Sequence, residues 1–99
     1  MICWVLYDIE SDKARTKSAK ACLRAGLNRV QYSCFVGDIE ESEKDALRVV
    51  LEDLIDEDTD KVYIFPMNRN EFSQTILLGQ AFDKKYVSGG VKICCFSHV

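Results

Sequence analysis

The chain has 99 residues, of which 47% are hydrophobic, and a formal net charge of -3 at pH 7. This length suits one domain with a single core, to which an interface between subunits would add substantial burial. No apolar run approaches the roughly 18 residues of a membrane span, and no basic region precedes the first one. These features argue against a membrane protein, and we expect a cytoplasmic chain with one domain over residues 1–99.

The cysteines indicate neither a disulfide framework nor a zinc site. Their number is odd, no C-x-x-C spacing occurs, and the one histidine is His98. We interpret them as small buried hydrophobic residues. They are Cys3, Cys22, Cys34, Cys94 and Cys95.

Acidic and basic residues are segregated along the chain. Six basic residues and no acidic one lie in Lys13–Gly37, whereas Asp38–Asp60 holds eleven acids against two bases. A basic segment can contact the phosphates of a nucleic acid, but it can equally form one solvated face of a globular protein. Charge alone leaves both interpretations open.

The first elements are a strand and a helix. Residues 2–9 are apolar and aromatic apart from Asp8, which predicts a central strand with a carboxylate near its end. Ser11 or Asp12 is expected to cap a helix that runs to about Ala25 and stops at Gly26. Residues 28–39 then have strand composition interrupted around "YS", which predicts two short strands or one bulged strand.

The second half repeats this pattern. Ser42 with Asp45 is expected to open a second helix, and residues 61–65 predict a strand that ends at Pro66. The order β-α-β-β-α-β indicates an α+β, ferredoxin-like sandwich with a core over about residues 1–78. Two further strands are predicted at 72–79 and about 91–96, the latter at a sheet edge or swapped onto a second subunit.

The predicted first helix carries a stripe of cations. At about 100° per residue, four basic residues superpose in a narrow sector, and small residues occupy the far side. We call this set the basic stripe: Lys13, Lys17, Lys20 and Arg24. Such a ridge can neutralise phosphates without reading bases, or simply face solvent. Arg15 needs a separate explanation, because a helix dipole disfavours a cation in the first turn.

Four short motifs, taken together and in order, resemble a known family. They are "YDI" at the end of the first strand, "R-x-K" at Arg15 and Lys17, "G-x-x-R-V-Q-x-S-x-F-x-G" over 26–37, and "V-x-I-F-P" before residue 67. The family is the small CRISPR-associated endonuclease of the adaptation module, the second of the two core proteins of spacer acquisition. Where many members carry a second arginine, this chain has Lys17, which keeps the charge but lacks the bidentate fork.

The resemblance implies a role for Asp8 as metal ligand and catalytic residue, with one Mg²⁺ or Mn²⁺ shared by the two copies of Asp8 in a homodimer. The residues agree with this, since the chain offers no Ser-His or Cys-His constellation and Mg²⁺ needs few carboxylates. The alternative is that Asp8 caps the next helix or pairs with Arg15 or Lys13. The family also implies a phosphate contact at Arg29, which is otherwise a strand-edge cation. Tyr7, Ser33 and Phe35 match positions around the implied site, although Tyr7 and Phe35 also suit core packing.

Two functions follow from the family. In the first, which we favour, a homodimer bridges dimers of a CRISPR-associated integrase in antiviral defence and supports a protospacer duplex. In the second, the protein is a metal-dependent phosphodiesterase acting on single-stranded RNA or duplex DNA. A toxin-type messenger-RNA interferase of the same fold would not account for "RVQYSCF". The expected phosphate contacts are Lys13, Arg15, Lys17, Lys20, Arg24 and Arg29.

Overall fold

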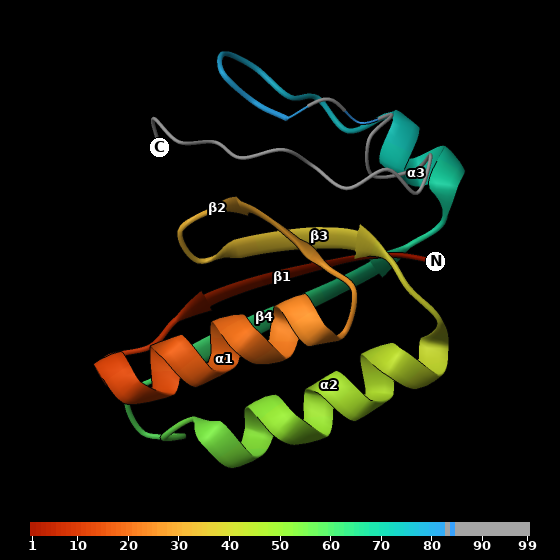
Figure 1. The fold of residues 1–99 in the computed structure, drawn as a ribbon. Helices are drawn as coiled ribbons and strands as arrows, with labels where there is room; N and C mark the ends of the chain where they lie inside the picture. Colours follow the sequence, from red (N-terminus) through yellow and green to blue (C-terminus); the bar gives the residue numbers. More distant parts are fainter. Residues whose placement is uncertain (83, 85–99) are drawn as a thin grey trace.

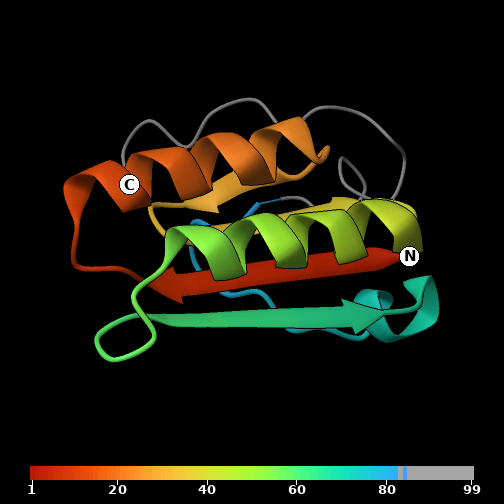
Figure 2. The same ribbon diagram turned by 90° about the horizontal axis from the view of Figure 1, so that it is seen from below.

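A computed structural model of the chain describes residues 1–82 and 84. Four strands form one antiparallel sheet in the order β2-β3-β1-β4, and two helices lie side by side across one of its faces (Figures 1 and 2). The elements are β1 Ile2–Asp8, α1 Asp12–Arg24, β2 Asn28–Gln31, β3 Cys34–Asp38, α2 Glu41–Leu54, β4 Lys61–Met67 and α3 Arg69–Ser73. The ferredoxin-like α+β fold is thus confirmed, while the predicted strand at 91–96 lies outside the described residues.

β1 is central because it is apolar on both faces. Cys3, Val5 and Tyr7 belong to the cluster beneath the helices, whereas Ile2 and Trp4 belong to the cluster on the other face. β3 pairs with one edge of β1 and β4 with the other, both antiparallel. The alternation of faces along this strand decides where its last side chain points.

The boundaries of α1 agree with the sequence. The Ser11 hydroxyl accepts a hydrogen bond from the amide of Ala14 at 3.2 Å, and Gly26 follows the helix with φ of 102°. α2 begins earlier than predicted, with Glu40 as its N-cap rather than Ser42. The reason is a capping interaction in which the Glu43 carboxylate accepts from the Glu40 amide at 2.9 Å.

Two predictions near β4 are wrong. The strand does not end at Pro66 but continues to Met67. β4 lies at the edge of the four-stranded sheet, where a proline is tolerated because its missing N–H is not needed for a hydrogen bond to a neighbouring strand. Residues 72–79 do not form a strand: α3 includes Phe72, and no regular element follows it through residue 79. Asn68 starts this helix by accepting from the amide of Glu71 at 2.7 Å.

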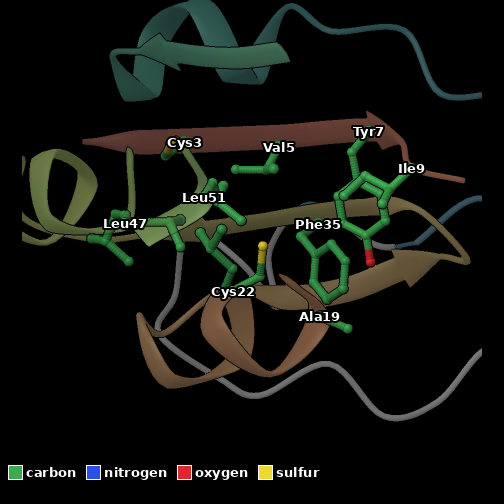
Figure 3. Packing of buried hydrophobic residues seen from close by; sticks show 11 residues of the cluster. Cys3, Val5, Tyr7, Ile9, Ala19, Cys22, Phe35, Leu47 and Leu51 are labelled. Atoms are coloured by element: carbon green, nitrogen blue, oxygen red, sulfur yellow. The ribbon is translucent and has the colours of Figure 1, made fainter. Parts of the chain in front are cut away.

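Hydrophobic clusters occupy both faces of the sheet. Figure 3 shows the helix-side cluster, in which Tyr7 packs beside Phe35 with ring centroids 5.9 Å apart. On the opposite face, Trp4 packs against Phe72 and Phe82 at 6.0 and 5.7 Å between ring centroids. α3 and the chain around residue 82 thus cover part of this face, and no other described segment packs on the rest of it. Among the described residues, no helix is long and apolar enough to cross a membrane.

Candidate metal and nucleic-acid site

Asp8 is the last residue of β1, and its side chain is exposed. Because Tyr7 is buried beneath the helices, the alternation of a strand directs Asp8 to the opposite face of the sheet. Its cross-strand partner on β4 is Lys61, which is also exposed, and the next pair on that face is Leu6 with Tyr63. Asp8 is therefore an accessible carboxylate at the margin of an open apolar face, with a cation beside it.

Lys61 is the site residue that sequence reasoning missed. The available signal was its place as the first residue of a predicted strand. If the two apolar strands pair in antiparallel fashion, the end of one meets the start of the other, which brings Asp8 to Lys61.

The structure does not support the alternative roles for Asp8. The cap of α1 is Ser11, and Arg15 pairs with Asp12. Within the part of the chain that the structure describes, no ion pair includes Asp8. The carboxylate is left available for a ligand or a partner.

One chain supplies only part of a metal site. Across residues 1–82 and 84, no three His, Cys, Asp or Glu side chains converge on one point. Asp60, next to Lys61, accepts hydrogen bonds from the amides of Asp56 at 2.9 Å and Glu10 at 3.0 Å, and these bonds lower its pKa. A carboxylate suits Mg²⁺, but one carboxylate beside a lysine binds it weakly. Further ligands would have to come from substrate phosphates, water or a second copy of the chain.

Arg15 holds the connection between β1 and α1. One guanidinium nitrogen donates to the carbonyls of Ile9 at 2.9 Å and Glu10 at 3.2 Å, and the other pairs with Asp12. These acceptors explain why a cation is tolerated in the first turn of a helix, where the dipole opposes it.

Arg29 packs against aromatic rings on the helix side of the sheet. It pairs in register with Phe35, so both side chains leave the sheet on the same face. Its guanidinium carbon lies 5.1 Å from the Phe35 centroid and 5.9 Å from that of Tyr32. Burial raises the pKa of Tyr7, and the charge of Arg29 opposes that rise. Arg29 and Phe35 are therefore on the other side of the sheet from Asp8.

Ser33 lies in the turn between β2 and β3. Its carbonyl accepts a hydrogen bond from the amide of Tyr7 at 3.1 Å. This bond extends the pairing of β1 beyond β3 and places the turn next to Asp8. Ser33 thus contacts, through its backbone carbonyl, the residue that precedes Asp8.

All four residues of the basic stripe on α1 are exposed. The buried residues of this helix are Ser18, Ala19 and Cys22, so the four cations face away from the sheet. The sheet therefore separates the stripe from Asp8. The structure places these candidates on two surfaces rather than in one site.

The described thiols are not placed for chemistry. Cys3 and Cys22 are fully buried, and burial raises the pKa of Cys22 to about 12. Cys34 is half-buried, and burial raises its pKa as well. The interpretation as buried hydrophobic residues is confirmed for Cys3 and Cys22.

Residues 1–75 match the family model of CRISPR associated protein Cas2. The chain belongs to this family. It is 36% identical over 83 residues to CRISPR-associated endoribonuclease Cas2 2 of Chloroflexus aurantiacus, covering 84% of this chain and 98% of that one. It is 32% identical to CRISPR-associated endoribonuclease Cas2 1 of Archaeoglobus fulgidus, covering 79% of this chain and 83% of that one.

Solved structures agree with this assignment to Cas2. The crystal structure of Streptococcus pyogenes Cas2 at pH 6.5 superposes with a TM-score of 0.68 at 28% identity, covering 80% of this chain and 100% of that one. A hypothetical protein, TT1823 from Thermus thermophilus, superposes with a TM-score of 0.69 at 31% identity, covering 81% and 92% of the two chains. The motif resemblance found in the sequence is therefore confirmed.

Proposed function

We propose that the chain acts as a homodimer in CRISPR spacer acquisition, where it bridges dimers of the CRISPR-associated integrase and supports a protospacer duplex. The observation that carries this proposal is the basic stripe on the outer face of α1. Its four cations span about 16 Å of helix, and all of them are exposed. A row of this kind suits the sugar-phosphate backbone of a duplex, which it would bind without sequence preference.

The open part of the other sheet face supports the dimer. Tyr63 and Phe65 are 53% and 48% exposed there, beside Leu6 at 36%. The rings of Tyr63 and Phe65 stack with centroids 6.3 Å apart. A second copy on this face would remove these rings from water and bring both Asp8 residues to one interface. The helices, and with them the basic stripe, would stay outside the dimer.

The exposed Asp8 favours a second activity, metal-dependent cleavage of a phosphodiester. When bound, Mg²⁺ or Mn²⁺ would polarise the phosphate and lower the pKa of a water. In this proposal Asp8 from each copy would hold the ion, and the ammonium group of Lys61 would form an ion pair with a phosphate oxygen. The endoribonuclease names of the relatives accord with such an activity in those proteins.

Co-purification with the integrase encoded alongside, followed by an integration assay on a DNA duplex, tests the proposal. Replacing Lys17 and Lys20 by Ala should reduce integration, whereas Asp8→Ala should leave it intact. The matched control is Arg48→Ala, which removes an exposed cation from α2. If Asp8→Ala alone stops integration, the chemistry at Asp8 is required and the bridging role does not suffice.

A further inference from the structure

The acidic half of the chain has no role in the proposed binding of a duplex. Eleven acids and two bases lie from the end of β3 to the start of β4, a segment that includes all of α2. Three of the acids, Asp45, Glu52 and Asp53, are exposed on α2, and they lie opposite its buried residues Leu47 and Leu51. We call these three acids the acidic face of α2. Like the basic stripe of α1, this face points away from the sheet.

α1 and α2 carry these opposite charges side by side. The two helices run antiparallel across one face of the sheet (Figure 2), and a hollow of about 320 Å³ lies between them. Arg24 and Glu43 both line this hollow, so the end of α1 lies beside the start of α2. Its apolar lining includes alanines and Val50, which is 44% exposed. Within the part of the chain that the structure describes, no ion pair joins the two helices, and neither Asp53 nor the basic stripe has an ion-pair partner.

This pair of helices is complementary in charge to a second copy of itself. A two-fold axis that runs along the contact, parallel to the helices, would place α1 of each copy on α2 of the other. Each residue of α1 would then meet the part of α2 that lies beside it in its own chain. Lys17 precedes Arg24 by about 10 Å of helix, which brings it level with the second half of α2 and within reach of Asp53. A two-fold axis across the helices would instead place the cations of one α1 on those of the other, so charge favours only the first arrangement.

We propose that a second copy of the chain docks on this surface, with the basic stripe of each copy on the acidic face of α2 of the other. The alanines of the hollow allow the four helices to approach closely. The contact is weak and depends on salt, because exposed ion pairs contribute little and are screened by ions. Asp45 and Glu52 already pair with Lys44 and Arg48 of their own helix. Asp53 is therefore the acid that contributes most.

This contact differs from the dimer through the open sheet face, and it covers the surface proposed for the duplex. The phosphates of a duplex and the carboxylates of a second copy bind the same cations, so each should exclude the other. This competition rests on the proposed binding of a duplex, whereas the contact between copies does not.

Sedimentation equilibrium of the whole chain at about 0.01 M and about 1 M salt tests the contact, since the Debye length changes from about 30 Å to about 3 Å. The wild type should form larger species at low salt than at high salt, where only the apolar sheet-face dimer remains. Lys17→Glu and Asp53→Lys should each weaken the low-salt association by roughly tenfold, because each removes two symmetric pairs. The variant with both substitutions restores opposite charges and should associate like the wild type. The single variants change the net charge in opposite directions, so a general effect of net charge would not weaken both.

Four results would overturn the proposal: equal sizes of the wild type at the two salt concentrations, association unchanged in either single variant, opposite effects of the two single variants, or no restoration in the double variant. Lys17 and Asp53 are both exposed, so the variants should fold, which circular dichroism checks.

Addition of a blunt DNA duplex at low salt tests the competition and should dissociate the larger species. Larger species that persist with the duplex bound would overturn the competition. A duplex that does not bind at all would reject the proposed function. The contact between copies would then still stand, because it is measured without DNA.

Discussion

Asp8 and Lys61 face one another at the last position of the β1–β4 register, on the sheet face that α1 and α2 leave uncovered. A cation beside a carboxylate lowers the affinity of the carboxylate for a metal ion. The same cation raises the affinity of the site for a phosphate. The pair therefore suits a site in which substrate and metal arrive together, and the contribution of each residue can be measured separately.

Replacing Asp8 by Ala should abolish any cleavage that depends on Mg²⁺ or Mn²⁺ and leave the dimer intact. The side chain is exposed and has no ion-pair partner in the described part of the chain, so its loss should cost little stability. Single-turnover cleavage and sedimentation are the measurements. Undiminished cleavage by a preparation free of contaminating nuclease would show that Asp8 is not the ligand.

Lys61→Ala should tighten the binding of Mn²⁺ to the protein. Removing a positive charge from beside an exposed carboxylate is worth about 1 kcal/mol, or about fivefold in half-saturating metal concentration. Titration followed by electron paramagnetic resonance measures free Mn²⁺ directly. Lys20→Ala, on the outer face of α1, is the control and should leave the titration unchanged. Equal effects of the two variants would mean that the metal does not bind at Asp8.

The fold was predictable wherever local chemistry and pattern agree. Ser11 and Gly26 are strong signals for the start and the end of α1. The residues of β1 are apolar on both faces, which predicts a central strand of the sheet. The errors arose where a less common residue performs the same task. Glu40 caps α2 although glutamate is not a usual cap, and Pro66 continues a strand because that strand is at an edge.

The site was predictable as residue types but not as an arrangement. Spacing on a helical wheel places the basic stripe on one face of α1, yet it does not show which face of the sheet α1 covers. That depends on the packing of Tyr7 beneath the helices, which directs Asp8 away from the stripe. Lys61 comes to Asp8 only through the pairing of β1 with β4, which is a contact between residues distant in sequence.

Duplex affinity should fall steeply with salt and depend little on sequence. Because each phosphate contact releases counterions, each cation removed from the basic stripe should reduce the slope of log affinity against log salt by about one unit. The variant with Lys17 and Lys20 both replaced by Ala tests this against Arg48→Ala. An unchanged slope in the double variant would place the duplex on another surface.

Phe65→Lys should weaken the dimer without unfolding the chain. The ring is 48% exposed, so each copy would bury about half of it in the interface, worth about 1 kcal/mol. Two copies give about 2 kcal/mol, which corresponds to roughly thirtyfold in the dissociation constant, and the buried ammonium adds to this loss. Val49→Lys is the matched control, because Val49 is 66% exposed on α2. Equal dissociation constants for the two variants, measured by sedimentation equilibrium, would move the interface elsewhere.

Stability should decline above about pH 9, and Cys22 should account for much of the decline. Burial raises the pKa of this thiol from 9.0 to about 12, so between these values the unfolded chain loses a proton that the folded chain retains. The unfolded state then binds fewer protons, and the free energy of unfolding falls by about 1.4 kcal/mol per pH unit from this group. The contribution of the buried neutral thiol is complete below pH 9 and is lost as the pH rises to about 12. Burial also raises the pKa of Cys3 and Tyr7, which add to the decline with the same sign.

Urea unfolding at a series of pH values measures this decline. Cys22→Ala should be less stable at neutral pH, because it leaves a small cavity, but its stability should fall less steeply above pH 9 than that of the wild type. The comparison of slopes separates the titration from the packing loss, since a cavity lowers stability at every pH alike. Parallel curves for the two proteins would show that another group governs the alkaline loss. In that case Cys3→Ala and Tyr7→Phe, examined in the same way, would identify which of the remaining buried groups it is.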